Sequence, residues 1–179
     1  MNFHPTVFEN IKVALENELY DMDNLDGLVT VSGRSDLMDM AVMGRELSLR
    51  FTLPGQSEVE AEAVLSSSLR ELAAELLAED EDGAAADEST CRLRIRFHME
   101  LEREDEQCQA IEHVLLQIFQ PTSRPTLTIS KIYGASQNSN ARCIAEIHFD
   151  RGIGEEQMED IPELLRHMAE TLKELGRLL

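Results

Sequence analysis

Three cysteines are each followed by a histidine, a combination that can ligate a metal or form a Cys–His catalytic pair. The pairs are Cys91 with His98, Cys108 with His113, and Cys143 with His148. The first and third pairs lie in expected strands, where their odd separations place the two side chains on opposite faces. The second lies in an expected helix, where five residues separate the side chains by about 140°. Zinc needs converging ligands, so we expect buried thiols and exposed imidazoles, with no metal site.

Other chemistry has little support in the sequence. The acidic runs 79–82 and 100–106 supply neither a scaffolded pair of carboxylates nor the spacing of a calcium loop. The glycines form no phosphate-binding loop. We therefore predict no catalytic, metal-binding or cofactor-binding residues and no cofactor. The competing interpretation is an enzyme or small-ligand protein whose site is assembled from scattered residues such as His98, His148 and Tyr133.

The one dense basic cluster lies in 91–102, which reads CRLRIRFHMELE. Its odd positions are apolar and its even positions polar, which predicts a half-buried strand with one charged face. The candidate partner-binding residues are Arg92, Arg94, Arg96 and His98. They can receive an acidic peptide, an anion or the acidic face of a second copy. Alternatively, the arginines pair within the chain with Glu46 or Glu146 on neighbouring strands.

Composition narrows the possible partners. The chain has 179 residues, with 16 Lys and Arg against 35 Asp and Glu, for a net charge of −19. Such a charge disfavours nucleic acid and anionic membranes, and favours solubility or a basic partner. No apolar run approaches the roughly 20 residues that cross a bilayer, and no secretory signal is visible. An odd number of cysteines without CxxC spacing predicts a reducing, cytoplasmic location.

The elements that would position these residues follow from periodicity and breakers. We expect helices at 6–20, 57–78, 104–120 and 155–178, the last one beginning at Ile161 or bending at Pro162. We expect strands at 28–32, 46–53, 91–102, 126–133 and 142–149, and an acidic linker at 79–89. A short strand is possible at 35–44, where Met38, Met40 and Met43 are either core filler or adaptable contacts on a partner-binding face.

The two halves follow one plan. With an offset of 98 residues, Leu49 falls on Ile147 and Phe51 on Phe149. We therefore expect a single α+β domain over 1–179, built from pseudo-repeats 6–78 and 104–178. Its mostly antiparallel sheet would be packed by helices, with two similar α-β-β-α halves joined by an extra central strand at 91–102.

The segment from Phe8 to Leu77, expected as helix, strands and helix, and the segment from Thr126 to Leu175, expected as strand, strand and helix, resemble the type III secretion chaperone-like fold of small acidic bacterial proteins. Residues 91–120 are additional to that pattern. The resemblance implies a cytoplasmic homodimer that binds another protein. We therefore expect a non-enzymatic adaptor, regulator or chaperone-like protein that docks through a sheet face or edge.

Overall fold

A computed structural model describes residues 6–78, 91–132, 134 and 140–179, which fold around one antiparallel sheet of six strands. The sheet order is β1-β2-β3-β4-β6-β5. Along the chain the elements are α1 (Val7–Asn24), β1 (Thr30–Asp39), β2 (Gly44–Leu53), β3 (Gln56–Ser67), α2 (Leu69–Ala78), β4 (Arg92–Leu101), α3 (Glu104–Phe119), β5 (Thr126–Ser130), β6 (Ala141–His148), the 3₁₀ helix η1 (Glu155–Asp160) and α4 (Ile161–Leu178). The predicted α+β class with an antiparallel sheet is confirmed.

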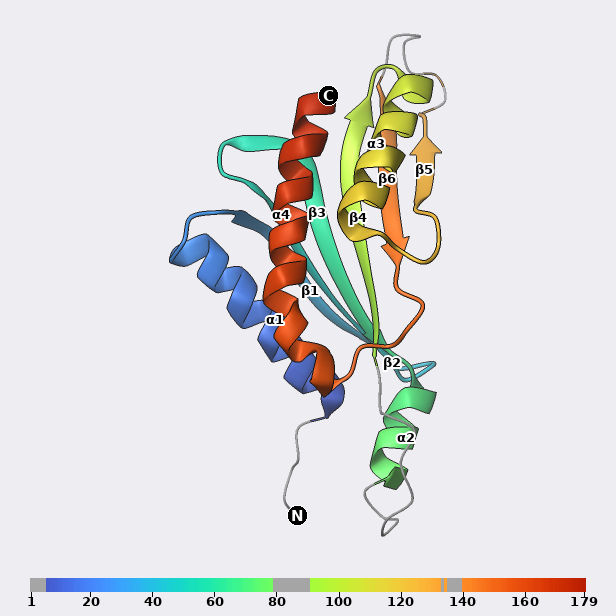
Figure 1. The fold of residues 1–179 in the computed structure, drawn as a ribbon. Coiled ribbons are helices and arrows are strands. Elements are labelled where there is room, and N and C mark those ends of the chain that lie inside the picture. The colour runs from blue at the N-terminus through green and yellow to red at the C-terminus, as the bar shows by residue number, and fades with distance from the viewer. Residues whose placement is uncertain (1–5, 79–90, 133, 135–139) are drawn as a thin grey trace.

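The helices α1, α4 and α3 lie side by side on one face of the sheet (Figure 1). The core forms between this layer and the sheet, and it draws on both halves of the chain, including Leu15, Phe51, Ile95 and Leu165. α2 extends beyond one end of the sheet, away from the helical layer. The opposite face of the sheet is open in the described part of the chain. No described helix is long and apolar enough to cross a membrane.

Strand β4 joins the two halves of the sheet. It pairs with β3 from the first half and with β6 from the second. Its side chains alternate as predicted: Leu93, Ile95 and Phe97 are buried, while the arginines between them lie on the open face. This strand is therefore the central connection that the sequence indicated.

The expected helix at 57–78 is wrong over its first half, where 56–67 form β3. Pro54 and Gly55 make a two-residue turn, with Gly55 at φ +73°, that returns β2 directly into an antiparallel neighbour. Buried Val59, Ala61 and Ala63 then alternate along β3. Small alanines are weak signals of a core-facing strand, so the leucine spacing around them suggested a helix. The first half is consequently α-β-β-β-α.

Several boundaries also differ. The expected strands 28–32 and 35–44 form one strand, β1, with a bulge between Val31 and Gly33. Strand 126–133 is shorter and ends at Ser130. The last helix begins at Ile161, although the Asp160 side chain makes no capping hydrogen bond. The predicted linker at 79–89 lies outside the described residues, and the pseudo-repeat stays a prediction.

Candidate functional site

The charged face of β4 is held by ion pairs within the sheet. Arg96 bonds to Glu146 on β6, and its Nη1 lies 3.7 Å from Oε2 of Glu62 on β3. His98 Nε2 lies 2.7 Å from the same Glu62 oxygen. Arg96 thus meets carboxylates from the strands on either side of β4, and His98 meets one from β3.

Glu62 is the centre of this network. Its side chain is only 3% exposed and accepts further hydrogen bonds from Ser48 Oγ at 2.5 Å and Arg50 Nε at 3.1 Å. Burial alone would raise the pKa of Glu62, but the hydrogen bonds from His98 and Ser48 and the charge of Arg50 outweigh it and lower the pKa to about 2. Glu62 therefore stays ionised and compensates several cationic groups at once.

Arg94 crosses a whole strand to reach its partner. Its Nη2 lies 2.6 Å from Oε2 of Glu46 on β2, although β3 lies between β2 and β4. Val64, directly opposite Arg94 in the register, is fully buried on this face, where no described helix covers it. The Arg94 Nε is buried without a hydrogen-bond partner. The aliphatic stem of an arginine can cover apolar surface in this way.

Arg92 differs from the other candidate residues. Its side chain is 83% exposed, and its single described ion pair is with Glu71 of α2, at 3.3 Å. Internal pairing thus occurs for Arg94 and Arg96 with Glu46 and Glu146, the two carboxylates named from the sequence. That the four residues bind a partner stays a prediction, and Arg92 is the member most accessible to one.

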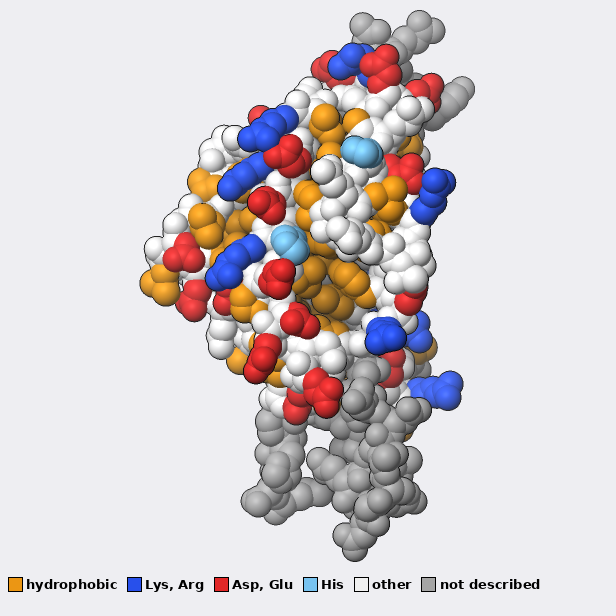
Figure 2. Space-filling model, viewed as in Figure 1, with side chains coloured by type: hydrophobic (Ala, Val, Ile, Leu, Met, Phe, Trp, Pro, Cys, Tyr) orange, Lys and Arg blue, Asp and Glu red, His pale blue; other side chains and the backbone are white. Residues whose placement is uncertain are grey.

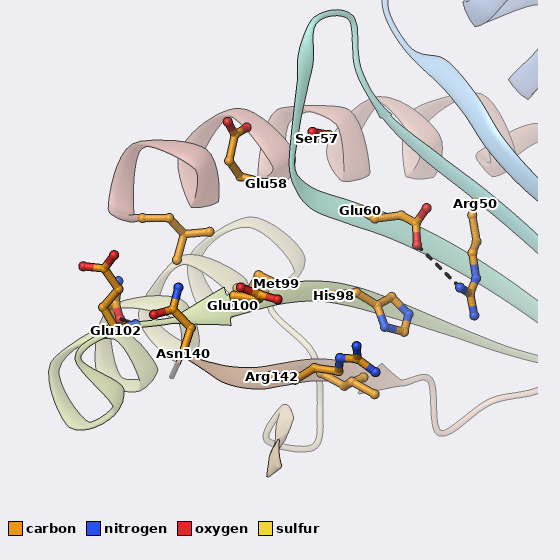
Figure 3. A pocket seen from close by; sticks show the side chains of 13 residues that line it. Arg50, Ser57, Glu58, Glu60, His98, Met99, Glu100, Glu102, Asn140 and Arg142 are labelled. Atoms are coloured by element: carbon orange, nitrogen blue, oxygen red, sulfur yellow. Dashed lines mark hydrogen bonds and ion pairs between the residues drawn. The ribbon is translucent and has the colours of Figure 1, made fainter. Parts of the chain in front are cut away.

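A cleft of about 850 Å³ opens where β3 and β4 separate beyond the Val59–Met99 pair (Figure 3). His98, Arg142 and several glutamates line it, and Arg50 pairs there with Glu60. His148 does not line this cleft, and Tyr133 lies outside the described residues. The structure therefore does not bring His98 and His148 together in this cleft.

The two cysteine–histidine pairs that lie on strands are also separated, and Cys108 on α3 is only partly buried. Cys91 and Cys143 are buried on the helix side, whereas His98 and His148 lie on the open face. Burial raises the pKa of the Cys143 thiol to about 11, which leaves it protonated near neutral pH. Among the described residues, no group of three His, Cys, Asp or Glu side chains could hold a metal ion.

A second ionic cluster fastens α1 to β1 and β2. Asp36 Oδ2 forms ion pairs with Lys12 Nζ at 2.9 Å and with Arg45 Nη2 at 3.0 Å, and Arg45 also pairs with Glu9. The Arg45 guanidinium lies 4.7 Å from the centroid of the Phe8 ring. The hydrogen bond from Arg45 lowers the pKa of Asp36 to about 2 against the opposing effect of burial. This cluster is structural, since each charge meets its partner within the chain.

The turn between β1 and β2 exposes an unusual apolar surface. Five large apolar side chains within seven consecutive residues are exposed: Leu37 63%, Met38 48%, Met40 71%, Val42 63% and Met43 36%. We call them the apolar hairpin. The alternative that these methionines fill the core is wrong. Asp39 Oδ1 accepts from Ala41 N–H at 2.9 Å, and Met43 has φ +53°, so the turn is held in a defined shape.

The apolar hairpin adjoins Arg92, at the exposed end of the basic cluster in 91–102. A groove of about 560 Å³ is lined by Leu37 of β1, Glu46 of β2, Ser66 of β3 and Arg92 of β4. Glu71 of α2 also lines this groove. Arg92 thus borders the apolar surface whose methionines the sequence left as either core filler or partner contacts.

A view of the helical side shows a different surface (Figure 2). Acidic side chains are spread over it among basic ones, with apolar side chains visible between them.

Comparisons with protein-family models, curated proteins and solved structures find no match for this chain. The geometry of the molecule itself is therefore the basis for its functional interpretation.

Proposed function

We propose that this chain is a non-enzymatic protein-binding protein, an adaptor, regulator or chaperone-like protein, whose docking surface is the apolar hairpin. The observation that carries this proposal is the exposure of five large apolar side chains at the end of an edge strand. Contiguous apolar surface on a soluble domain marks interaction sites, because its burial is favourable. Methionines suit such a surface, since their flexible thioethers adapt to different partners.

The edge position of β1 supports the same function. Among the described strands only β2 pairs with it. The Val31 N–H is bonded to Asp23 Oδ2, but the backbone beyond the bulge can receive another strand. The bulge at Val31 and the charges of Arg34 and Asp36 are features that limit indiscriminate pairing along an edge. Beyond Asp36 the strand becomes apolar. A partner can thus combine backbone pairing with contact to the hairpin.

An enzyme or small-ligand protein has less support. The cleft beside β3 and β4 contains His98, whose Nε2 is bonded to the buried carboxylate of Glu62. A catalytic site needs a second group beside such an imidazole, and His148 does not line the cleft. The exposed apolar hairpin favours an adaptor over catalysis.

The resemblance to type III secretion chaperone-like proteins belongs to this proposal, together with homodimer formation and a bacterial, cytoplasmic setting. It is supported by the chain's length, its charge of −19 and its antiparallel sheet packed by helices. Chaperone-like binding of a partner through exposed apolar surface is consistent with the apolar hairpin.

Site-specific photo-crosslinking tests the docking surface. A Val42→p-benzoylphenylalanine variant should form covalent adducts with protein when irradiated in the lysate of cells that express it. The matched control, Val13→p-benzoylphenylalanine, replaces another exposed valine, on α1 and away from the hairpin, which is 48% exposed against 63% for Val42. Adducts that form from Val42 and not from Val13 would support the proposal. The absence of adducts from Val42, or an identical pattern from both positions, would refute it.

A further inference from the structure

We infer that this chain binds a free α-amino acid with an apolar side chain, in a pocket of about 250 Å³ next to the start of α4. The ligand class follows from the apolar lining of the pocket, from its size and from two opposite charges that line it. The pocket shares no lining residue with the groove beside the apolar hairpin, so this inference does not rest on the proposed protein-binding function.

The connection from β6 to α4 forms one wall of the pocket. It crosses the beginning of β4 (Figure 1), where Cys91 and Ile153 exchange backbone hydrogen bonds of 2.8 and 2.7 Å. Just beyond that bridge, the Gly154 N–H donates to Gln157 Oε1 at 2.7 Å, across the start of η1. Hydrogen bonds on both sides of this wall therefore hold it in a defined position.

The interior of the pocket is apolar. Its lining includes Leu93 of β4, Phe149 and Ile153 of the connection, and Ile161 and Leu164 of α4. Leu93, Ile153 and Ile161 are no more than 9% exposed, so they belong to the core as well. An apolar cavity of about 150 Å³ holds one benzene ring. A pocket of about 250 Å³ therefore accommodates a branched or aromatic side chain together with the carbon atom that carries its polar groups.

Two opposite charges also line the pocket. Arg151, in the connection, and Asp160, at the end of η1, are both exposed and so lie where the pocket meets solvent. Within the described chain neither side chain forms a hydrogen bond or an ion pair. Asp150, beside Arg151, bonds to Ser123 instead, and Asp160 makes no capping bond to α4 although it occupies the N-cap position. The Arg151 guanidinium is therefore available to a carboxylate, and the Asp160 carboxylate to an ammonium group.

An α-amino acid matches these groups because one carbon atom carries its carboxylate, its ammonium group and its side chain. The carboxylate would pair with Arg151, which can hold it through two parallel hydrogen bonds. The ammonium group would pair with Asp160, and the side chain would enter the apolar interior.

Ligands with a single charge fit less well. The pocket lining has a net charge of 1 − 1 = 0, from Arg151 and Asp160, in a chain of −19. A fatty acid would leave Asp160 without a partner and would meet the exposed glutamates of η1, Glu156 and Glu159, which repel anions. An alkyl amine would leave Arg151 without a partner. A zwitterion satisfies both charges at once.

A titration of the full chain followed by ¹⁵N–¹H NMR tests the inference with matched ligands, and it detects binding of millimolar affinity. L-Leucine and L-phenylalanine should each shift the amide signals of residues 151–164. Three analogues of leucine each lack one group: 4-methylpentanoate has no ammonium group, 3-methylbutylamine has no carboxylate and glycine has no side chain. Each should bind at least about tenfold more weakly than leucine, since loss of one charge-assisted bond or of the buried side chain removes about 1.4 kcal/mol or more.

Two variants assign each charge to its group on the ligand. Arg151→Gln should weaken leucine at least about tenfold and leave 3-methylbutylamine unchanged, whereas Asp160→Asn should weaken leucine and leave 4-methylpentanoate unchanged. The controls Arg124→Gln and Glu159→Gln change exposed charges outside the pocket lining and should leave leucine binding as it is.

Three results would overturn the inference. Leucine and phenylalanine at millimolar concentration could leave the signals of residues 151–164 unchanged. The analogue 4-methylpentanoate or 3-methylbutylamine could bind as tightly as leucine. Finally, both variants could weaken all ligands equally, or not at all. The crosslinking at Val42 tests the docking surface independently, so failure of one proposal leaves the other intact.

Discussion

Replacement of Glu62 by glutamine should destabilise the fold in a manner that depends on pH. Glutamine keeps the shape of the side chain but removes the charge that Arg50, Arg96 and His98 share. Removal of one member of a buried ionic network is costly, because its partners stay desolvated without compensation.

The magnitude follows from the pKa of Glu62, which is lowered from 4.5 to about 2 on folding. Each unit of pKa difference corresponds to about 1.4 kcal/mol, so the ionised carboxylate contributes roughly 3 kcal/mol. Because the folded pKa is the lower one, this stability is present in full above pH 4.5 and is lost as the pH falls towards 2. The Glu62→Gln variant lacks it throughout.

The assay is urea unfolding of both proteins at pH 7, 5, 4 and 3, at one fixed protein concentration. The difference in unfolding free energy should be about 3 kcal/mol at pH 7 and should shrink steadily below pH 4.5. Glu100→Gln is the matched control, since Glu100 is an exposed glutamate on the same face of β4. Its effect should stay within about 0.5 kcal/mol.

Two results would refute the reasoning. A Glu62→Gln variant as stable as the wild type at pH 7 would show that the cations on the open face do not need this carboxylate. A loss that stays constant from pH 7 to pH 3 would show that the change disturbs packing and not charge.

Three further predictions concern stability, each measured by urea unfolding. Arg96→Ser should lower the free energy of unfolding by about 1–2 kcal/mol, because it removes a cation from Glu62 and Glu146. The exposed Arg92→Ser should change it by less than about 0.5 kcal/mol. Equal effects would contradict the internal pairing. Asp36→Asn should lower the free energy of unfolding by about 2 kcal/mol at pH 7 and by progressively less below pH 4, since the folded pKa of Asp36 is about 2 against an ordinary 3.8. A loss that does not depend on pH would contradict this role of the Asp36 charge. Gly55→Ala should cost about 1 kcal/mol because Gly55 has φ +73°, and an unchanged stability would argue against a left-handed turn there.

Elements with strong local patterns could be predicted from the sequence. The alternation in 91–102 identifies β4 and its charged face, because a strand exposes every second residue whatever its neighbours are. The helical spacing of Ile11, Leu15 and Leu19 likewise identifies α1. These features depend on a few adjacent residues and not on the rest of the fold.

The network around Glu62 was missed because β3 was interpreted as the start of a helix. Two-residue turns of the Pro54-Gly55 kind join antiparallel strands, and this signal could have placed 56–67 against β2. Glu60 and Glu62 would then have faced the arginines of the open side. The misleading evidence was the leucine spacing from Leu65 onwards, which belongs partly to β3 and partly to α2.

The position of a strand in the sheet, more than its own composition, decides what it can bind. β4 carries the most basic segment of the chain, but it is central, so carboxylates from β2, β3 and β6 reach Arg94 and Arg96 and compensate them. β1 has an ordinary composition, but it is an edge strand, and β2 is its one neighbour among the described strands. Its apolar residues beyond Asp36 therefore have no described element to cover them. Sheet order depends on residues far apart in the chain. The sequence therefore favoured the arginines as the binding residues, whereas the structure favours the apolar hairpin.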